Sequence, residues 1–319
     1  MFRGFFSKEN RIVDGREAIV VNMPGHYTLC DTMECGQCFR YELVRKDAEM
    51  TEYVIPVGDV LIDVAQTKPG ELIFFGLSDE EFERVARPYF TLDTDYEAIR
   101  RDIMERTDSE WLRAAAECAK GIAILKQDPW EALFSFIISQ NNNIPRIRKI
   151  IREMSSAYGV NISLQNNAQK CPANKIGGTP CEEKCKSCGI CYTFPRCDEV
   201  LKNPEAMLPS HPGFRYRYLL DAAEKVHTCA VNLDHIAKAT SYDVTVAELT
   251  KIVGVGEKVA ACCALFGFAN LEAFPIDVWM KRAINDYFDG RLDPKTLGPY
   301  AGVAQQYIFH YIRNIESKN

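Results

Sequence analysis

Residues 245–268 read TVAELTKIVGVGEKVAACCALFGF, a stretch that predicts two helices joined by a glycine-rich turn. Thr245 and Glu248 have the spacing of a capping box, which predicts a short helix. A tight turn with two glycines follows at residues 254–256, and a second helix is expected from about Glu257. Glycines let backbone N–H groups approach a ligand closely, and the start of a helix favours an anion. The turn is therefore suited to holding a phosphate.

Two ionisable residues beside this turn are candidates for chemistry. Lys258 is expected in the first turn of the second helix, where the helix end and burial both disfavour the ammonium form and free the amine as a nucleophile. The alternative is a lysine that only binds phosphate. Asp277, in the stretch FPIDVWM, occupies a predicted N-cap position, where backbone N–H groups keep a carboxylate ionised. It is equally explained as a cap alone.

The rest of the chain divides into a strand-rich part and a helical part. Residues 1 to about 77 read as short strands and turns, and helical patterns start at the capping box formed by Ser78 and Glu81. The predicted fold class is α+β, with a β-rich N-terminal domain followed by two mostly α-helical lobes. We place the N-terminal domain at residues 1–122 and the helical domain at 123–319, with a cysteine-rich insertion at about 161–200.

The overall charge argues mildly against a nucleic-acid partner. The net charge is −6 over 319 residues, so DNA binding requires a local basic face. Arg146, Arg148, Lys149 and Arg152 are the candidates for that face, and a solvated helix surface is the alternative. No apolar run reaches the length of a membrane span, and we recognise no signal peptide, so the expected location is cytoplasmic.

VGVGEKVAACCALFGF followed by PIDVWM resembles the helix-hairpin-helix DNA glycosylases, in particular the 8-oxoguanine DNA glycosylase branch. The resemblance spans nearly the whole chain apart from the insertion. It implies a base-excision repair enzyme that removes 8-oxoguanine, preferably opposite cytosine. It also implies that Lys258 attacks the anomeric carbon of the sugar while Asp277 stabilises the developing positive charge. The resulting Schiff base supports β-elimination, the lyase step at the abasic site.

The same resemblance implies a pocket for the extruded base. Gly36, in CGQCFR, corresponds to the glycine whose carbonyl accepts the ring hydrogen that 8-oxoguanine carries and guanine lacks. Gln305 would bond the Watson–Crick edge, and Phe309, four residues later, would stack on one face of the base. Cys262 would approach the other face. The alternatives are a turn glycine at position 36 and core packing for Phe309 and Cys262.

Residues that contact the DNA follow from the resemblance in the same way. Two segments carry them, SQNNNIPR from Ser139 and HPGFRYRY from His211. The opposite cytosine would be read by Asn141, Arg146 and Arg215, the base stack would be opened by Phe214, and phosphate would be held by Gly254 and Gly256. The sequence departs from the family pattern at Trp279, where many relatives carry histidine, and at Phe214, which replaces tyrosine. For the asparagine run, a connection rich in helix caps is the alternative.

The insertion is dense in cysteine. Six of the thirteen cysteines lie between Cys171 and Cys197. The spacing predicts a structural zinc ion or iron–sulfur cluster, with a reduced loop as the alternative. The expected ligands are Cys185, Cys188 and Cys191, with Cys181 or Cys197 as the fourth. Nothing in the predicted chemistry of Lys258 requires a cofactor.

Three other functions remain open at this point. The chain could be a helix-hairpin-helix glycosylase for another oxidised base, a DNA-binding module or damage sensor without catalysis, or a metal or redox sensor. The expected partner is double-stranded DNA containing oxidised guanine. A monomer is expected because DNA would cover one face. Such an enzyme would work at the nucleoid of a prokaryote or in the nucleus of a eukaryote.

Overall fold

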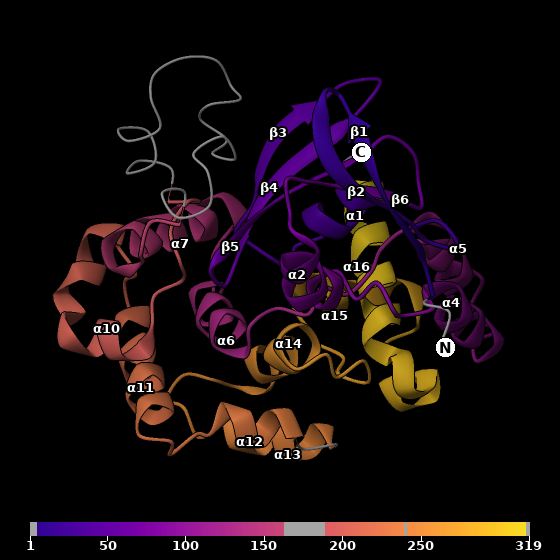
Figure 1. Cartoon of the computed structure of the whole chain (residues 1–319). Helices are drawn as coiled ribbons and strands as arrows, with labels where there is room; N and C mark the ends of the chain where they lie inside the picture. The colour runs from indigo at the N-terminus through magenta and orange to yellow at the C-terminus, as the bar shows by residue number, and fades with distance from the viewer. Residues whose placement is uncertain (1–4, 163–188, 239–240, 317–319) are drawn as a thin grey trace.

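The computed structural model describes residues 5–162, 189–238 and 241–316. Within these ranges an antiparallel six-stranded sheet is followed by helices (Figure 1), which confirms the predicted α+β class. The strands pair in the order β1-β2-β6-β5-β4-β3. Their bounds are β1 Ser7–Val13, β2 Arg16–Asn22, β3 Glu42–Lys46, β4 Thr51–Val57, β5 Val60–Gln66 and β6 Glu71–Phe75.

One helix interrupts the sheet in sequence, and the others follow it. The helix within the sheet segment is α1 Leu29–Glu34. The next group is α2 Asp79–Glu81, the π-helix η1 Phe82–Ala86, α3 Arg87–Tyr89, α4 Tyr96–Glu105, α5 Glu110–Cys118, α6 Pro129–Ile138 and α7 Ile144–Tyr158. The last group is α10 Cys197–Lys202, η3 Pro204–Ser210, α11 Arg215–His227, α12 Leu233–Lys238, α13 Tyr242–Leu249, α14 Glu257–Gly267, α15 Val278–Tyr287, η4 Pro294–Tyr300 and α16 Ala301–Glu316.

The sheet is buried on both faces at its centre. Successive side chains of a strand point to opposite faces, so Ile19 and Val21 join one hydrophobic cluster while Ala18 and Val20 join another. The first cluster also takes in the helices after Ser78, whose predicted capping box is present. The sheet and the helices that follow Ser78 therefore share one core.

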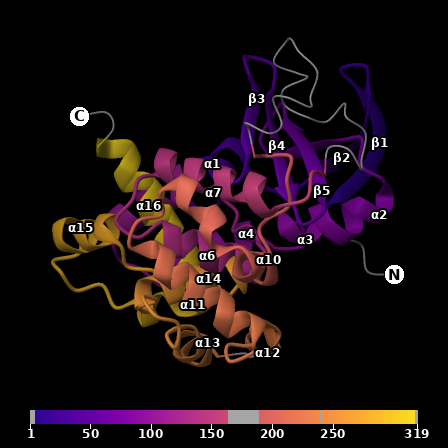
Figure 2. The same cartoon turned by 90° about the vertical axis from the view of Figure 1, so that its left-hand side faces the viewer.

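The helical part has one large core. Residues of α4 and α5 belong to the same cluster as α6, α14 and α16, so this core draws on both sides of residue 122. α14 packs along α6, and α5 packs along α16. In the view turned by 90° (Figure 2), the strands gather on one side of the molecule, while α13 and α15 lie away from them. The site described below lies in the helical part, next to the end of α1.

The predicted start of the first hairpin helix is wrong. α13 begins at Tyr242, and its N-cap is Ser241, which lies four residues before Thr245. The Thr245 hydroxyl donates to the Ser241 carbonyl at 3.3 Å. Glu248 accepts from Lys251 Nζ instead of closing a capping box. Thr245 is buried, so its side chain has the packing role of a residue inside the helix.

The described ends of the insertion pack on the sheet. Asn161 and Tyr192 form an isolated bridge, and Ile162, Ile190 and Cys191 join a cluster with residues of β4 and β5. In the part of the chain that the structure describes, no helix has both the length and the apolar composition needed to cross a bilayer.

Candidate active site

A pocket of about 760 Å³ opens where α6, α14, α15 and α16 approach the segment after α1. The predicted nucleophile Lys258 and its partner Asp277 both line this pocket. Several residues predicted for base or DNA contact line it too, and they are Gly36, Asn141, Gly256 and Phe309. Segments from both ends of the chain therefore meet in one concave site.

Lys258 is half-buried in the first turn of α14. Gly256 is the N-cap of this helix, and every residue from Val259 to Gly267 is buried, so the helix is fixed by its own packing. The Lys258 Nζ lies 5.5 Å from the centre of the Phe136 ring on α6. The amine is thus held at a helix start, against an aromatic wall, facing the pocket.

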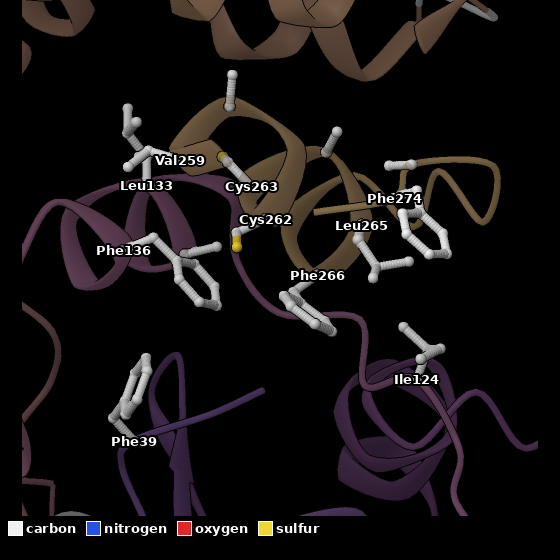
Figure 3. Packing of buried hydrophobic residues seen from close by; sticks show 14 of the residues in the cluster. Phe39, Ile124, Leu133, Phe136, Val259, Cys262, Cys263, Leu265, Phe266 and Phe274 are labelled. Atoms are coloured by element: carbon white, nitrogen blue, oxygen red, sulfur yellow. The ribbon is translucent and has the colours of Figure 1, made fainter. Parts of the chain in front are cut away.

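Cys262 lies close enough to Lys258 and Asp277 to feel the charges of both. It lies one turn after Lys258 on α14 and is 4% exposed. Figure 3 shows it projecting toward the side of α14 that faces Phe136. Burial raises the pKa of its thiol to about 11; the charge of Lys258 opposes this rise and the charge of Asp277 adds to it. Lys258 and Asp277 both act on this thiol, which stays neutral near pH 7.

Asp277 is the N-cap of α15, as its position after Pro275 predicts. Its Oδ1 accepts from the Met280 N–H at 2.9 Å. One carboxylate oxygen is therefore committed to the helix, and the residue still lines the pocket. A carboxylate fixed in this way suits the stabilisation of positive charge without having to reorganise.

Gly36 and Phe309 lie against each other in the lining of the pocket. Gly36 has a φ of +84°, which L side chains rarely adopt, and a Cβ added there would lie 3.5 Å from Phe309 Cε1. Phe309 is half-buried on α16. Gln305, one turn earlier, is 3% exposed, and its Oε1 accepts from Gln306 Nε2 at 2.7 Å. Gln305 is not among the residues that line the pocket.

Gln37, which the sequence motifs do not single out, fixes the backbone next to Gly36. Its side chain is fully buried and donates to the carbonyls of Thr32 and Ala123, each at 2.8 Å. Its Oε1 accepts from the Leu125 N–H at 2.8 Å. The sequence shows only a polar residue between Cys35 and Cys38. Two of the hydrogen-bond partners of Gln37, Ala123 and Leu125, are too distant in the sequence to be predicted from that pattern. Arg313 and Lys281 also line the pocket and were missed.

The asparagine run combines the two interpretations considered for it. Asn143 caps α7 by accepting from the Arg146 N–H at 3.0 Å, and Asn142 donates to the Ile138 carbonyl at 3.1 Å. Asn141 is exposed with a φ of +46°, and its side chain makes no hydrogen bond to residues in the described ranges. Two asparagines are structural caps, whereas Asn141 is available at the pocket.

Arg215 is buried and holds this same turn. Its guanidinium donates to the carbonyls of Gln140 and Asn141, with an Nε to Gln140 distance of 2.8 Å. Burial lowers the pKa of Arg215, and the charge of Arg146 acts in the same direction. Arg146 itself is exposed, and neighbouring Phe214 is 45% exposed. The predicted wedge is therefore accessible, while Arg215 is engaged with the backbone.

The predicted basic face is only partly correct. Arg148 lies over the Tyr41 ring and donates to the Tyr41 carbonyl, and Arg152 forms an ion pair with Glu42. These two cations join α7 to the sheet. Lys149 has a side chain that is 71% exposed, and its ion pair with Glu153 is long, at 3.9 Å, so it remains accessible.

The expected metal ligands Cys181, Cys185 and Cys188 lie outside the described residues. Cys191 is fully buried against β4 and β5, and Cys197 is half-buried at the start of α10. Within residues 5–162, 189–238 and 241–316, no group of three histidine, cysteine or acidic side chains is placed to hold a metal ion.

The fold and the pocket define the helix-hairpin-helix class of DNA glycosylases. The N-terminal domain model of 8-oxoguanine DNA glycosylase matches residues 20–133. The chain also superposes on MBOgg1 in complex with a low-affinity DNA ligand, with 30% identity, a TM-score of 0.80 and coverage of 98% of this chain and 99% of that one. This chain belongs to the 8-oxoguanine DNA glycosylase family.

Two further proteins with similar sequences or structures carry names from the same family. A Clostridium acetobutylicum 8-oxoguanine glycosylase/lyase, solved with double-stranded DNA containing cytosine opposite 8-oxoG, is 28% identical with a TM-score of 0.80. That alignment covers 98% of this chain and 100% of the other. The N-glycosylase/DNA lyase of Saccharomyces cerevisiae is 25% identical over 286 residues, which are 81% of this chain and 68% of the yeast protein.

Proposed function

We propose that this protein excises 8-oxoguanine from double-stranded DNA, preferably opposite cytosine, and then cleaves the strand by β-elimination. The observation that carries the proposal is one pocket that is lined by Lys258 and Asp277 and also by Gly36, which lies against Phe309. A nucleophile and a charge stabiliser thus face a slot with an aromatic wall. The family relationship and the names of the relatives support the same activity.

In the proposed reaction, the amine of Lys258 attacks C1′ of the damaged nucleotide. The C1′–N9 bond breaks, and its electron pair leaves with the base. Asp277 stabilises the positive charge that develops on the sugar. After the amine loses its protons and the sugar ring opens, the product is a Schiff base on Lys258. Loss of the C2′ proton then expels the 3′ phosphate and nicks the strand. This chemistry uses only groups of the chain.

Base selection is proposed to depend on Gly36, Phe309, Cys262 and Gln305. The Gly36 carbonyl would accept the ring N–H that distinguishes 8-oxoguanine from guanine. Phe309 would stack on one face of the base, and the neutral thiol of Cys262 would meet the other face. Gln305, which is buried one turn before Phe309 on α16, would bond the Watson–Crick edge after Phe309 or Gln306 shifts.

Reading of the opposite strand is proposed for Asn141, Arg146, Phe214 and Arg215. On binding DNA, the Arg215 guanidinium would either release the Asn141 carbonyl and bind the cytosine, or keep that contact and hold Asn141 against the cytosine. Hairpin N–H groups at Gly254 and Gly256 would hold a phosphate. Trp279 lines the pocket, and it stands where the family resemblance gives histidine, so the phosphate contact would be made differently here. Acting on DNA, the enzyme would work at the nucleoid or in the nucleus.

A panel of DNA duplexes tests the proposed substrate specificity. Each duplex carries one modified or normal base opposite cytosine, and the released free base is measured by chromatography and mass. We expect release of 8-oxoguanine and no release of guanine. Release of a different oxidised base in preference to 8-oxoguanine would replace this proposal with another glycosylase specificity. Binding without any base release would favour a damage sensor.

We further propose that the cysteine-rich insertion holds a structural metal centre through Cys185, Cys188 and Cys191, with Cys181 or Cys197 as the fourth ligand. The support is the density and spacing of the cysteines. Metal analysis of protein purified without oxygen tests this. Bound zinc or iron that is lost in Cys188→Ser supports a centre, and metal-free active protein contradicts it.

A further inference from the structure

One face of α11 contacts the backbone of the hairpin between α13 and α14. Tyr218, Asp221 and Lys225 are spaced by three and four residues, so they share that face. At the N-terminal end of the same helix are Phe214 and Arg215, the predicted wedge and the arginine that holds the asparagine turn. α11 therefore joins the two segments proposed to contact DNA.

The contacts with the hairpin are direct. Asp221 Oδ2 accepts from the Val253 N–H at 2.6 Å. Lys225 Nζ donates to the same oxygen at 2.9 Å and to the Lys251 carbonyl at 2.7 Å. The side chains of Asp221 and Lys225 are only 23% and 28% exposed, so solvent screens them incompletely.

Tyr218 adds a steric contact one residue further along the hairpin. A Cβ at Gly254 would lie 2.4 Å from Tyr218 ring carbons, so the ring packs directly on the glycine backbone. The hairpin N–H groups at Gly254 and Gly256 donate to no other residue in the described part of the chain. They are the groups left for a phosphate once Val253 is held by Asp221.

The carboxylate of Asp221 would repel a phosphate bound to this hairpin if its charge were not balanced. Lys225 balances it from the same helix. We propose that Asp221 and Lys225 form a charge-compensated clamp. In this clamp Asp221 positions the phosphate-binding hairpin, and Lys225 cancels the negative charge of the Asp221 carboxylate. Both are positioning residues, and the inference rests on the proposed function because it requires DNA on the hairpin.

The test measures binding to a duplex that contains a tetrahydrofuran abasic analogue opposite cytosine, by fluorescence anisotropy at low and moderate salt. Lys225→Met leaves the carboxylate uncompensated, and we expect Kd to rise about tenfold at low salt, because a unit charge several ångströms from a phosphate has an effect of that order. Asp221→Asn with Lys225→Met removes both charges but keeps the acceptor for Val253. Its Kd should return to within about twofold of wild type.

Arg106→Met is the matched control, because Arg106 also pairs with an aspartate four residues earlier, at 2.7 Å from Asp102. It lies outside the pocket and the hairpin, so the same change in net charge should move Kd by less than about twofold. Melting temperatures of all variants show whether each one folds.

A double variant that binds as weakly as Lys225→Met, or a Lys225→Met protein that binds like wild type, would overturn the clamp. A merely structural pair would make the double variant the weaker one, because it has lost more contacts. If wild type binds the analogue no better than undamaged duplex, the proposed function fails and the clamp fails with it. That outcome differs from the first two because it appears before any substitution is made.

Discussion

At the residue scale, Asp277 has two roles that one substitution separates. It caps α15 through the Met280 N–H, and in the proposed mechanism its charge stabilises the sugar. Asp277→Asn keeps a capping oxygen and removes the charge, so we expect single-turnover excision to slow by about 10²-fold or more with little change in melting temperature. Asp277→Ala should in addition lose about 1 kcal/mol of stability. Wild-type excision by the asparagine variant would reduce Asp277 to a helix cap.

The buried thiol of Cys262 predicts a specific alkaline response. Its pKa is raised by burial to about 11, from an ordinary value of 9.0. The unfolded thiol ionises first as pH rises, so the stabilising effect is present below pH 9 and is lost between pH 9 and 11. Over that window the free energy of unfolding should fall more in wild type than in Cys262→Ala, by up to about 3 kcal/mol. If the free energy of unfolding falls equally with pH in the two proteins, the raised pKa of Cys262 is contradicted.

At the scale of elements, the hairpin contains two glycines with different requirements. Gly254 has a φ of +81° and no room for a Cβ beside Tyr218, whereas Gly256 has a negative φ and nothing within 4 Å of its Cβ position. Gly254→Ala should destabilise the protein by about 1–3 kcal/mol and weaken binding to abasic-analogue duplex. Gly256→Ala should change the free energy of unfolding by less than about 1 kcal/mol. Denaturant unfolding of both variants checks this, and equal losses would contradict the turn geometry described above.

Elements with local signals were predictable from sequence, and those set by distant contacts were not. The caps at Ser78 and Asp277 depend on residues within three positions, so the sequence alone located both helix starts. Thr245 was misread because its burial inside α13 depends on the helical core. The contacts of Arg215 with the asparagine turn were not predictable, because the carbonyls it binds belong to residues about 75 positions earlier in the chain.

At the scale of the whole molecule, an acidic protein must bind DNA through a small number of free cations. Lys149 makes only a long ion pair with Glu153, at 3.9 Å, and its side chain is 71% exposed, whereas Arg152 is paired closely with Glu42 and is 33% exposed. Lys149→Gln should lower the slope of log Kd against log salt by roughly one unit, and Arg152→Gln should leave it nearly unchanged. Salt titrations of both variants measure this. A larger change for Arg152→Gln would place the DNA on the sheet side of α7.

The site as a whole was predictable only as far as the family resemblance reached. Gly36, Lys258, Asp277 and Phe309 were assigned from motifs at both ends of the chain, and the structure brings all four into one pocket. Gln37 carried no motif of its own, because its function in positioning Gly36 depends on bonds to residues near 32 and 123.

Covalent trapping is the most direct test of the central claim that Lys258 is the nucleophile of a base-excising enzyme. The protein is incubated with a duplex containing 8-oxoguanine opposite cytosine in the presence of borohydride, which reduces a Schiff base to a stable adduct. We predict a covalent protein–DNA complex whose peptide map places the adduct on Lys258, and no complex with Lys258→Gln. Wild-type protein that excises the base without trapping, or an adduct that persists in Lys258→Gln, would contradict the account.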